Sequence, residues 1–241
     1  MAARRLLASL VISGAAIVIV RLALGPARSF SLEVHAPPTL DGWLLCVVLG
    51  ALIGVLGVAY NKTVLLTLTL SDRCSRIPLE VRAAAVGVVI AGIAWWTPGL
   101  VGGGDTLTQD ALDGRMIVVW LPVVFALRFA LGALSYATAV PGGLFAPLLV
   151  LGAQGGLLFG MAGRELAPQL TADPTMLAVC GMAAFFTAVV RAPLTGIILV
   201  SEMTGSFDLL LPMLGACFSA GAVASLPRDE PIYSALRRRL P

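Results

Sequence analysis

A short break in a long apolar stretch is the first place where this sequence could do chemistry. The segment "PGGLFAP", Pro141–Pro147, sets two prolines and a glycine pair among apolar residues and contains no charged side chain. The pair Gly142 and Gly143 permits a tight turn and a close backbone approach. Pro147 suits the first turn of a new helix, because a backbone N–H is not needed there. The segment therefore predicts that one helix ends here and another begins.

The start of the second helix could bind an anion. If this helix begins near Ala146, the amides of Leu144 and Phe145 have no helical acceptor and lie at the positive end of the helix dipole. Such donors bind an anion without a cationic side chain. If such a site lies in an ion pathway, it must bind the ion favourably yet weakly enough to release it. An ordinary turn between two membrane helices would explain the same residues.

Few charged side chains lie inside apolar sequence. Arg191 and Glu202 are the most embedded, and their spacing of 11 positions is about three turns along one helix face. Charges inside a membrane segment are candidates for function. We expect structural roles instead, with each charge paired or placed at a helix end, and we expect the same of Arg128. A proton relay at Glu202 is the alternative.

The remaining polar residues do not indicate an enzyme or a metal site. The chain has one histidine, His35, and its four cysteines form no C-x-x-C pair. Scattered cysteines favour packing roles over metal binding or disulfides. We expect no catalytic residue, no metal and no cofactor. Tyr233 could donate its phenol O–H to an anion, or it could anchor the chain at the membrane–water interface.

The composition predicts a membrane protein. Hydrophobic residues make up 59% of the 241 residues and charged residues only 12%, with a mean hydropathy of +0.97, whereas soluble domains carry about 25% charged residues. Several apolar runs are long enough to span a bilayer as helices. We expect membrane segments at Leu6–Leu24, Trp43–Leu70, Val81–Trp96, Met116–Val140, Leu144–Ala162, Thr175–Val200 and Leu209–Leu226. Residues 1–241 would then form one transmembrane domain with no soluble domain.

Glycine and proline interrupt these runs at many points, and the breaks predict the architecture. Broken helices survive in lipid only where protein or a polar cavity covers the break. We therefore expect an all-α membrane protein built as a bundle of tilted, partial and re-entrant helices. Two pairs of small residues, Gly50 with Gly54 and Gly152 with Gly156, have the spacing that lets membrane helices pack closely.

The positions of the arginines predict an orientation in the membrane. Arg73, Arg76 and Arg82 flank one loop, and further arginines precede the first run and follow the last. By the positive-inside rule these clusters face the cytoplasm, and both termini do so with them. The basic C-terminal tail is then a topology anchor, and we expect no nucleic acid as a partner. Fifteen arginines against one lysine suggest a bacterial plasma membrane.

Four motifs resemble the CLC family of chloride channels and proton-coupled chloride antiporters. The segment "PGGLFAP" is similar to the family's G-x-F-x-P motif. The run Met182–Met213, which contains "RAPLTGIILVSEMT", resembles the family's late helices. "TPGLVGGGDTL" at Thr97–Leu107 resembles a glycine-rich turn of the second repeat, and Glu230–Leu240 resembles the closing P-x-Y segment. The resemblance implies a CLC-like fold, corresponding to the later part of an inverted-repeat bundle.

The resemblance also implies a site and partners. The amides of Leu144 and Phe145 and the phenol of Tyr233 would hold a central chloride ion, in a chain that transports anions across a lipid bilayer. Tyr233 favours chloride, bromide or nitrate over fluoride, because fluoride-exporting relatives typically lack the matching tyrosine. Family members are homodimers with a separate pore in each subunit, so we expect a homodimer.

Two family elements have no counterpart in this sequence. One is the early turn whose serine contacts the chloride, and the other is the G-[KR]-E-G-P turn whose glutamate gates the pathway. An N-terminal half carrying the gating glutamate is therefore a candidate partner. Both a channel and a proton-coupled antiporter fit the residues present. The alternative to a transporting chain is a dimerising one that conducts nothing until an upstream half joins it.

Overall fold

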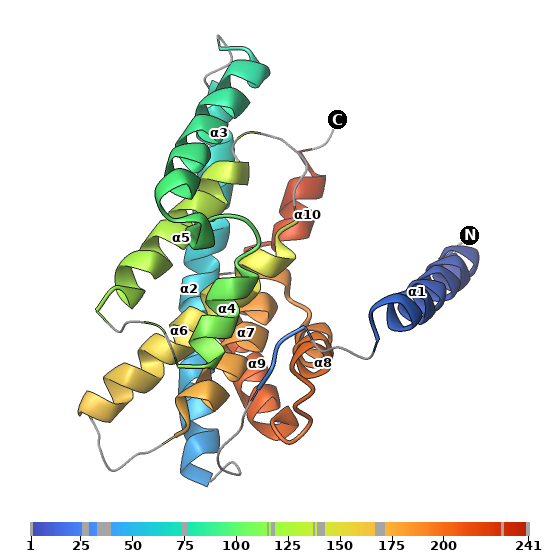
Figure 1. Ribbon diagram of the computed structural model, residues 1–241, viewed down its shortest axis with the longest axis vertical. Coiled ribbons are helices and arrows are strands. Elements are labelled where there is room, and N and C mark those ends of the chain that lie inside the picture. The colour runs from blue at the N-terminus through green and yellow to red at the C-terminus, as the bar shows by residue number, and fades with distance from the viewer. Residues whose placement is uncertain are drawn as a thin grey trace.

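Most of the helices form one bundle, and the N-terminal helix lies apart from it (Figure 1). The computed structural model describes residues 2–25, 29–32, 40–73, 77–114, 116, 119–136, 138, 143–166, 172–227 and 229–239. Every regular element in these residues is helical, which confirms the predicted all-α fold class. The elements are α1 Ala2–Leu24, α2 Leu40–Arg73, α3 Leu79–Trp96, η1 Pro98–Leu100, α4 Asp105–Leu112, α5 Leu121–Tyr136, α6 Phe145–Leu166, α7 Pro174–Val190, α8 Pro193–Thr204, α9 Leu210–Ser225 and α10 Ile232–Arg237. By length and composition, α2, α3 and α6 could each cross a membrane.

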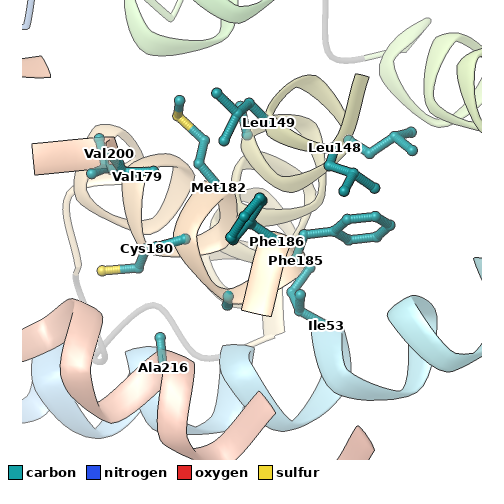
Figure 2. Packing of buried hydrophobic residues seen from close by; sticks show 14 of the residues in the cluster. Ile53, Leu148, Leu149, Val179, Cys180, Met182, Phe185, Phe186, Val200 and Ala216 are labelled. Carbon is teal, nitrogen blue, oxygen red and sulfur yellow. The ribbon is translucent and has the colours of Figure 1, made fainter. Parts of the chain in front are cut away.

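Helix α7 is the centre of the bundle. Every residue from Met176 to Val189 is buried, because α7 packs against α6, α2, α9 and α8 on different sides. A helix that is apolar all round requires such surroundings. Figure 2 shows Phe185 and Phe186 of α7 between residues of α6 and Ile53 of α2. Helices α2, α6, α8 and α9 therefore all pack on this one element.

Glycines set how closely α6 approaches α7. A Cβ atom at Gly152 would overlap the Gly181 carbonyl oxygen, and one at Gly156 would overlap the carbonyl of Leu177. The two backbones are thus in direct contact, with no side chain between them. Close backbone contact brings more atoms into van der Waals range, which is a main source of helix association in lipid. The predicted pair of Gly152 and Gly156 is confirmed as a packing contact.

The second predicted pair joins α2 to α9. A Cβ atom at Gly50 would overlap the Ala216 carbonyl oxygen, and one at Gly54 would lie 2.9 Å from the Ala220 carbonyl oxygen. Ser219 of α9 adds a hydrogen bond across the same contact, because its hydroxyl donates to the carbonyl oxygen of Val47 at 2.8 Å. This pair is also confirmed, so small residues hold α9 against the longest helix of the bundle.

The predicted segment Thr175–Val200 is two helices rather than one. Helix α7 ends at Val190, and Arg191 adopts a left-handed conformation with φ of 63°. Ala192 precedes Pro193 and is held out of the helical region, with φ of −128° and ψ of 76°, as expected for a residue before proline. Arg191 and Glu202 consequently lie on different elements. The expectation that they share one helix face is wrong.

The α6–α7 contact makes a prediction about stability. Changing Gly156 to alanine should lower the stability of the folded chain by about 1–3 kcal/mol, because the new methyl group forces the backbones apart. Gly163 lies on the same helix, and a Cβ atom there would meet nothing within 4 Å. Gly163→Ala is therefore the matched control and should be neutral or slightly stabilising. Thermal unfolding in detergent measures both. Equal melting temperatures for the two variants would contradict the packing described.

Candidate functional site

Helix α6 begins at the predicted break, one residue earlier than expected. Phe145 is its first residue, and the carbonyl of Leu144 accepts the first helical hydrogen bond from the Leu148 N–H at 3.1 Å. Pro147 falls in the first turn, as predicted, where it removes no helical hydrogen bond. The amides of Leu144 and Phe145 therefore have no helical acceptor. The Leu144 side chain is only 2% exposed, whereas Gly143 before it is exposed, so the helix start lies at the edge of the protein interior.

The structure describes only one residue of the glycine pair before α6. Gly142 lies outside the described residues. A Cβ atom at Gly143 would meet nothing within 4 Å, so crowding gives no reason for glycine there. Gly143 does line a cavity, so the absence of a side chain keeps that wall open.

This cavity has a volume of about 330 Å³ and lies at the start of α6. Gly143, Leu144 and Pro147 form one wall, and α2, α3 and α5 contribute most of the rest. Most of the lining is apolar, but Tyr60 of α2 and Arg128 of α5 bring polar groups to it. An apolar hollow with a few converging donors is the usual form of a small-ligand site. The predicted helix start thus opens onto a cavity.

Arg128 fastens the glycine-rich turn to α5. It is 7% exposed, and its Nη1 donates to the carbonyl oxygens of Leu100 at 3.1 Å and Gly102 at 3.0 Å. Gly104, with φ of 85°, leaves room for the guanidinium, since a Cβ atom there would overlap Nη2. The expectation of a structural, partnered arginine is confirmed. Nη2 itself has no hydrogen-bond partner among the described residues, so a buried cation keeps an unused donor.

Tyr60 is a cavity residue that the sequence analysis missed. Its side chain is fully buried, and its ring meets Phe129 and Phe185 edge-on at centroid distances of 5.1 and 5.8 Å. Its hydroxyl has no hydrogen-bond partner within the described part of the chain, although buried tyrosines usually find one. The available signal was a lone tyrosine in the middle of the apolar run Trp43–Leu70.

The other two predicted anion-site residues take different positions. The Phe145 ring packs edge-on against Phe186 of α7 at a centroid distance of 5.7 Å, which fixes the start of α6 to the centre of the bundle. Tyr233 lies on α10, is 49% exposed and does not line the cavity. Tyr136 does line it, and its phenol is close enough to that of Tyr233 for an electrostatic interaction. Tyr233 is therefore near the cavity but outside its wall.

Arg191 follows the last residue of α7, and Glu202 lies in the last turn of α8. Arg191 caps α7: its Nε donates to the Ala188 carbonyl oxygen at 3.0 Å, and its Nη1 donates to Ser225 Oγ at 2.9 Å. These bonds tie the end of α7 to the end of α9. Glu202 is exposed near the end of α8. Neither residue lines the cavity at the start of α6.

Sequence comparisons relate the chain to ion transporters. The family described as Voltage gated chloride channel matches residues 1–225. The H(+)/Cl(-) exchange transporter ClcA of Vibrio parahaemolyticus is 35% identical over 225 residues, and that of Klebsiella pneumoniae is 37% identical over 201 residues. These matches cover 92% and 82% of this chain but 48% and 42% of the relatives. The chain therefore spans about half the length of the curated relatives it matches.

Solved structures agree with this assignment. A slow cyanobacterial Cl-/H+ antiporter superposes with a TM-score of 0.85 at 31% identity, over 92% of this chain and 52% of that one. A CLC-type fluoride/proton antiporter has a TM-score of 0.68 at 17% identity, over 84% of this chain and 49% of that one, and shares the fold. The family match, which includes the break before α6, leads to one conclusion: the chain belongs to the CLC family of voltage gated chloride channels.

Proposed function

We propose that this chain forms part of a chloride pathway across a membrane, in which the amides of Leu144 and Phe145 and the phenol of Tyr233 hold the central ion. The observation that supports this proposal is the cavity at the start of α6, which Leu144 lines at the point where helix amides have no helical acceptor. Relatives named as H(+)/Cl(-) exchange transporters support chloride as the cargo. They also support transport, rather than covalent catalysis, as the activity.

The electrostatics of the cavity suit an ion that must leave again. The start of α6 offers partial positive charge from its dipole and its amides. Arg128 adds a full positive charge at the same cavity, but its Nη1 is already held by two carbonyl oxygens. A cation restrained by other partners raises the local anion concentration without closing around the ion. Release of the ion therefore stays possible, as conduction requires.

Further protein would complete this pathway. Helix α3 is apolar yet has no buried residue, and its Trp95 and Trp96 are 86% and 84% exposed. Such a surface needs lipid or protein against it. We propose an upstream half carrying the gating glutamate as one partner and a second copy of the chain as another. The second candidate function is a dimerising chain that is inactive without that half, and the uncovered apolar face of α3 favours it.

The orientation proposed for the chain has support from contacts at one end of the bundle. Arg239 Nη1 lies 3.3 Å from Asp72 Oδ2, and Arg82 Nη1 donates to Ser71 Oγ at 2.7 Å. The arginine clusters after α2 and in the C-terminal tail thus share one end of the molecule. We propose that this end faces the cytoplasm of a bacterial cell, with both termini on that side.

Chloride efflux from liposomes that contain the purified chain tests the proposed function. We expect efflux above that of empty liposomes, and we expect Tyr233→Phe to reduce apparent chloride affinity about 10–100-fold, because one hydrogen bond to a charged group is lost. Leu166→Ala, at the exposed end of α6 far from the cavity, is the control and should change nothing. A folded, dimeric sample without efflux would contradict transport by this chain alone and would favour the second candidate function.

The buried hydroxyl of Tyr60 supplies a second test. Tyr60→Phe removes a group that has no partner in the described structure, so the stability of the chain without chloride should stay the same or rise. If the hydroxyl donates to an anion in the cavity, the variant should gain less thermal stability from added chloride than the native chain does. Melting curves in chloride and in gluconate at equal ionic strength measure this. An unchanged chloride effect would exclude Tyr60 from the anion's surroundings.

A further inference from the structure

We propose that Cys46 and Cys180 are a site of oxidative modification, at which an uncharged two-electron oxidant joins the two sulfur atoms and links α2 to α7. The Cys46 thiol donates a hydrogen bond to Cys180 Sγ at 3.3 Å, across 134 positions of sequence. Both side chains are fully buried. This inference rests on the packing of the bundle and does not depend on the proposed transport function.

The geometry of the pair requires only a small adjustment. A disulfide has a sulfur–sulfur distance of about 2.0 Å, so the two atoms must approach by a little over 1 Å. The thiols already point at each other from two helices in direct contact. Figure 2 shows Cys180 on α7 and Ala216 on the neighbouring α9, with α2 passing below them.

The third described cysteine provides a contrast. Cys217 is equally buried but lies on α9 beside a different cavity, with Thr187 and Arg191. Cys46 and Cys180 are the cysteines whose sulfurs form a contact within the described ranges. If the oxidant joins the sulfur atoms that lie closest together, Cys46 should pair with Cys180 and Cys217 should remain a thiol. Cys74 lies outside the described residues.

The chemistry balances with an azodicarboxamide as the oxidant. One thiol adds across the N=N bond, its proton passes to a nitrogen, and a sulfur–nitrogen bond forms. The second thiol then attacks that sulfur, the S–S bond forms, and the sulfur–nitrogen bond breaks. The second proton ends on the other nitrogen, so the diazene is reduced to a hydrazine while two thiols become one disulfide. The oxidant is uncharged, which lets it enter the apolar bundle.

A link at this position should stabilise the folded chain. It would close a loop of 134 positions between the central helix and the longest one, and cross-links across long loops restrict the unfolded chain most. We expect the melting temperature to rise by roughly 5–15 °C after oxidation. A reducing agent should reverse this rise in melting temperature when the chain is partly unfolded, because the buried disulfide is then accessible to it.

The test uses the full chain, folded in detergent and treated with an azodicarboxamide or with molecular iodine. Remaining thiols are then alkylated under denaturing conditions, and the products are analysed by mass spectrometry. The proposal predicts a chain lighter by two hydrogens and a cross-linked peptide pair that contains Cys46 and Cys180. Cys217→Ala should keep this product, as the matched control, whereas Cys46→Ala and Cys180→Ala should each abolish both the product and the rise in melting temperature.

Two results would overturn the proposal. One is full alkylation of Cys46 and Cys180 after both oxidants, in a chain that is folded by size-exclusion chromatography. The other is a cross-link to Cys217 or Cys74 in place of the predicted pair. Cys46→Val serves as a second variant if alanine at this position prevents folding, because valine fills the space of the thiol.

Discussion

A polypeptide inside a bilayer has no water to satisfy its backbone groups, and this constraint shapes every break in the bundle. Where the chain leaves helical conformation near Leu100 and Gly102, the guanidinium of Arg128 takes up their carbonyl oxygens. Where α7 ends, Arg191 does the same for Ala188. At these two breaks, arginine side chains thus donate hydrogen bonds to backbone carbonyl oxygens. The start of α6 is the opposite case, since it presents donors, and a mobile anion is the partner that such donors can take and release.

The protein accommodates these breaks because neighbouring helices pack in direct backbone contact. Gly152 and Gly156 bring α6 onto α7, and Gly50 and Gly54 bring α2 onto α9. Helix association in lipid depends on such contact, because apolar side chains gain little by leaving lipid for protein. The close packing also fixes the start of α6, through the contact of Phe145 with Phe186. The proposed anion site therefore stands on a closely packed part of the bundle.

The sequence was informative wherever a single local signal decides the conformation. Pro147 behind a glycine pair predicted the start of α6 to within one residue, and the four-residue spacing of Gly50 and Gly54 predicted a helix contact. Pro193 was among the expected interruptions, yet Arg191 and Glu202 were placed on one helix, because the sequence on both sides of Pro193 is apolar. The apolar composition therefore predicted the full length of the segment Thr175–Val200, whereas the backbone conformations of Arg191 and Ala192 divide it into two helices.

The cavity itself could not be predicted from local pattern. It is assembled from α2, α3, α5 and the start of α6, so its polar members are far apart in sequence. Tyr60 looked like one more residue of an apolar helix, and Arg128 looked like a structural charge, which it also is. Tyr233 had the family's motif in its favour, yet α10 holds it beside the cavity and half exposed. Only the packing of distant elements decides which of these groups meet.

The central claim is that backbone amides at the start of α6 bind an anion, and anomalous diffraction tests it most directly. Crystals of the chain grown in bromide would locate the anion without any change to the protein. The account predicts an anomalous peak within about 3.5 Å of the amide nitrogens of Leu144 and Phe145. A well-ordered α6 with no bromide at its start would contradict the account and make the break an ordinary turn between two membrane helices.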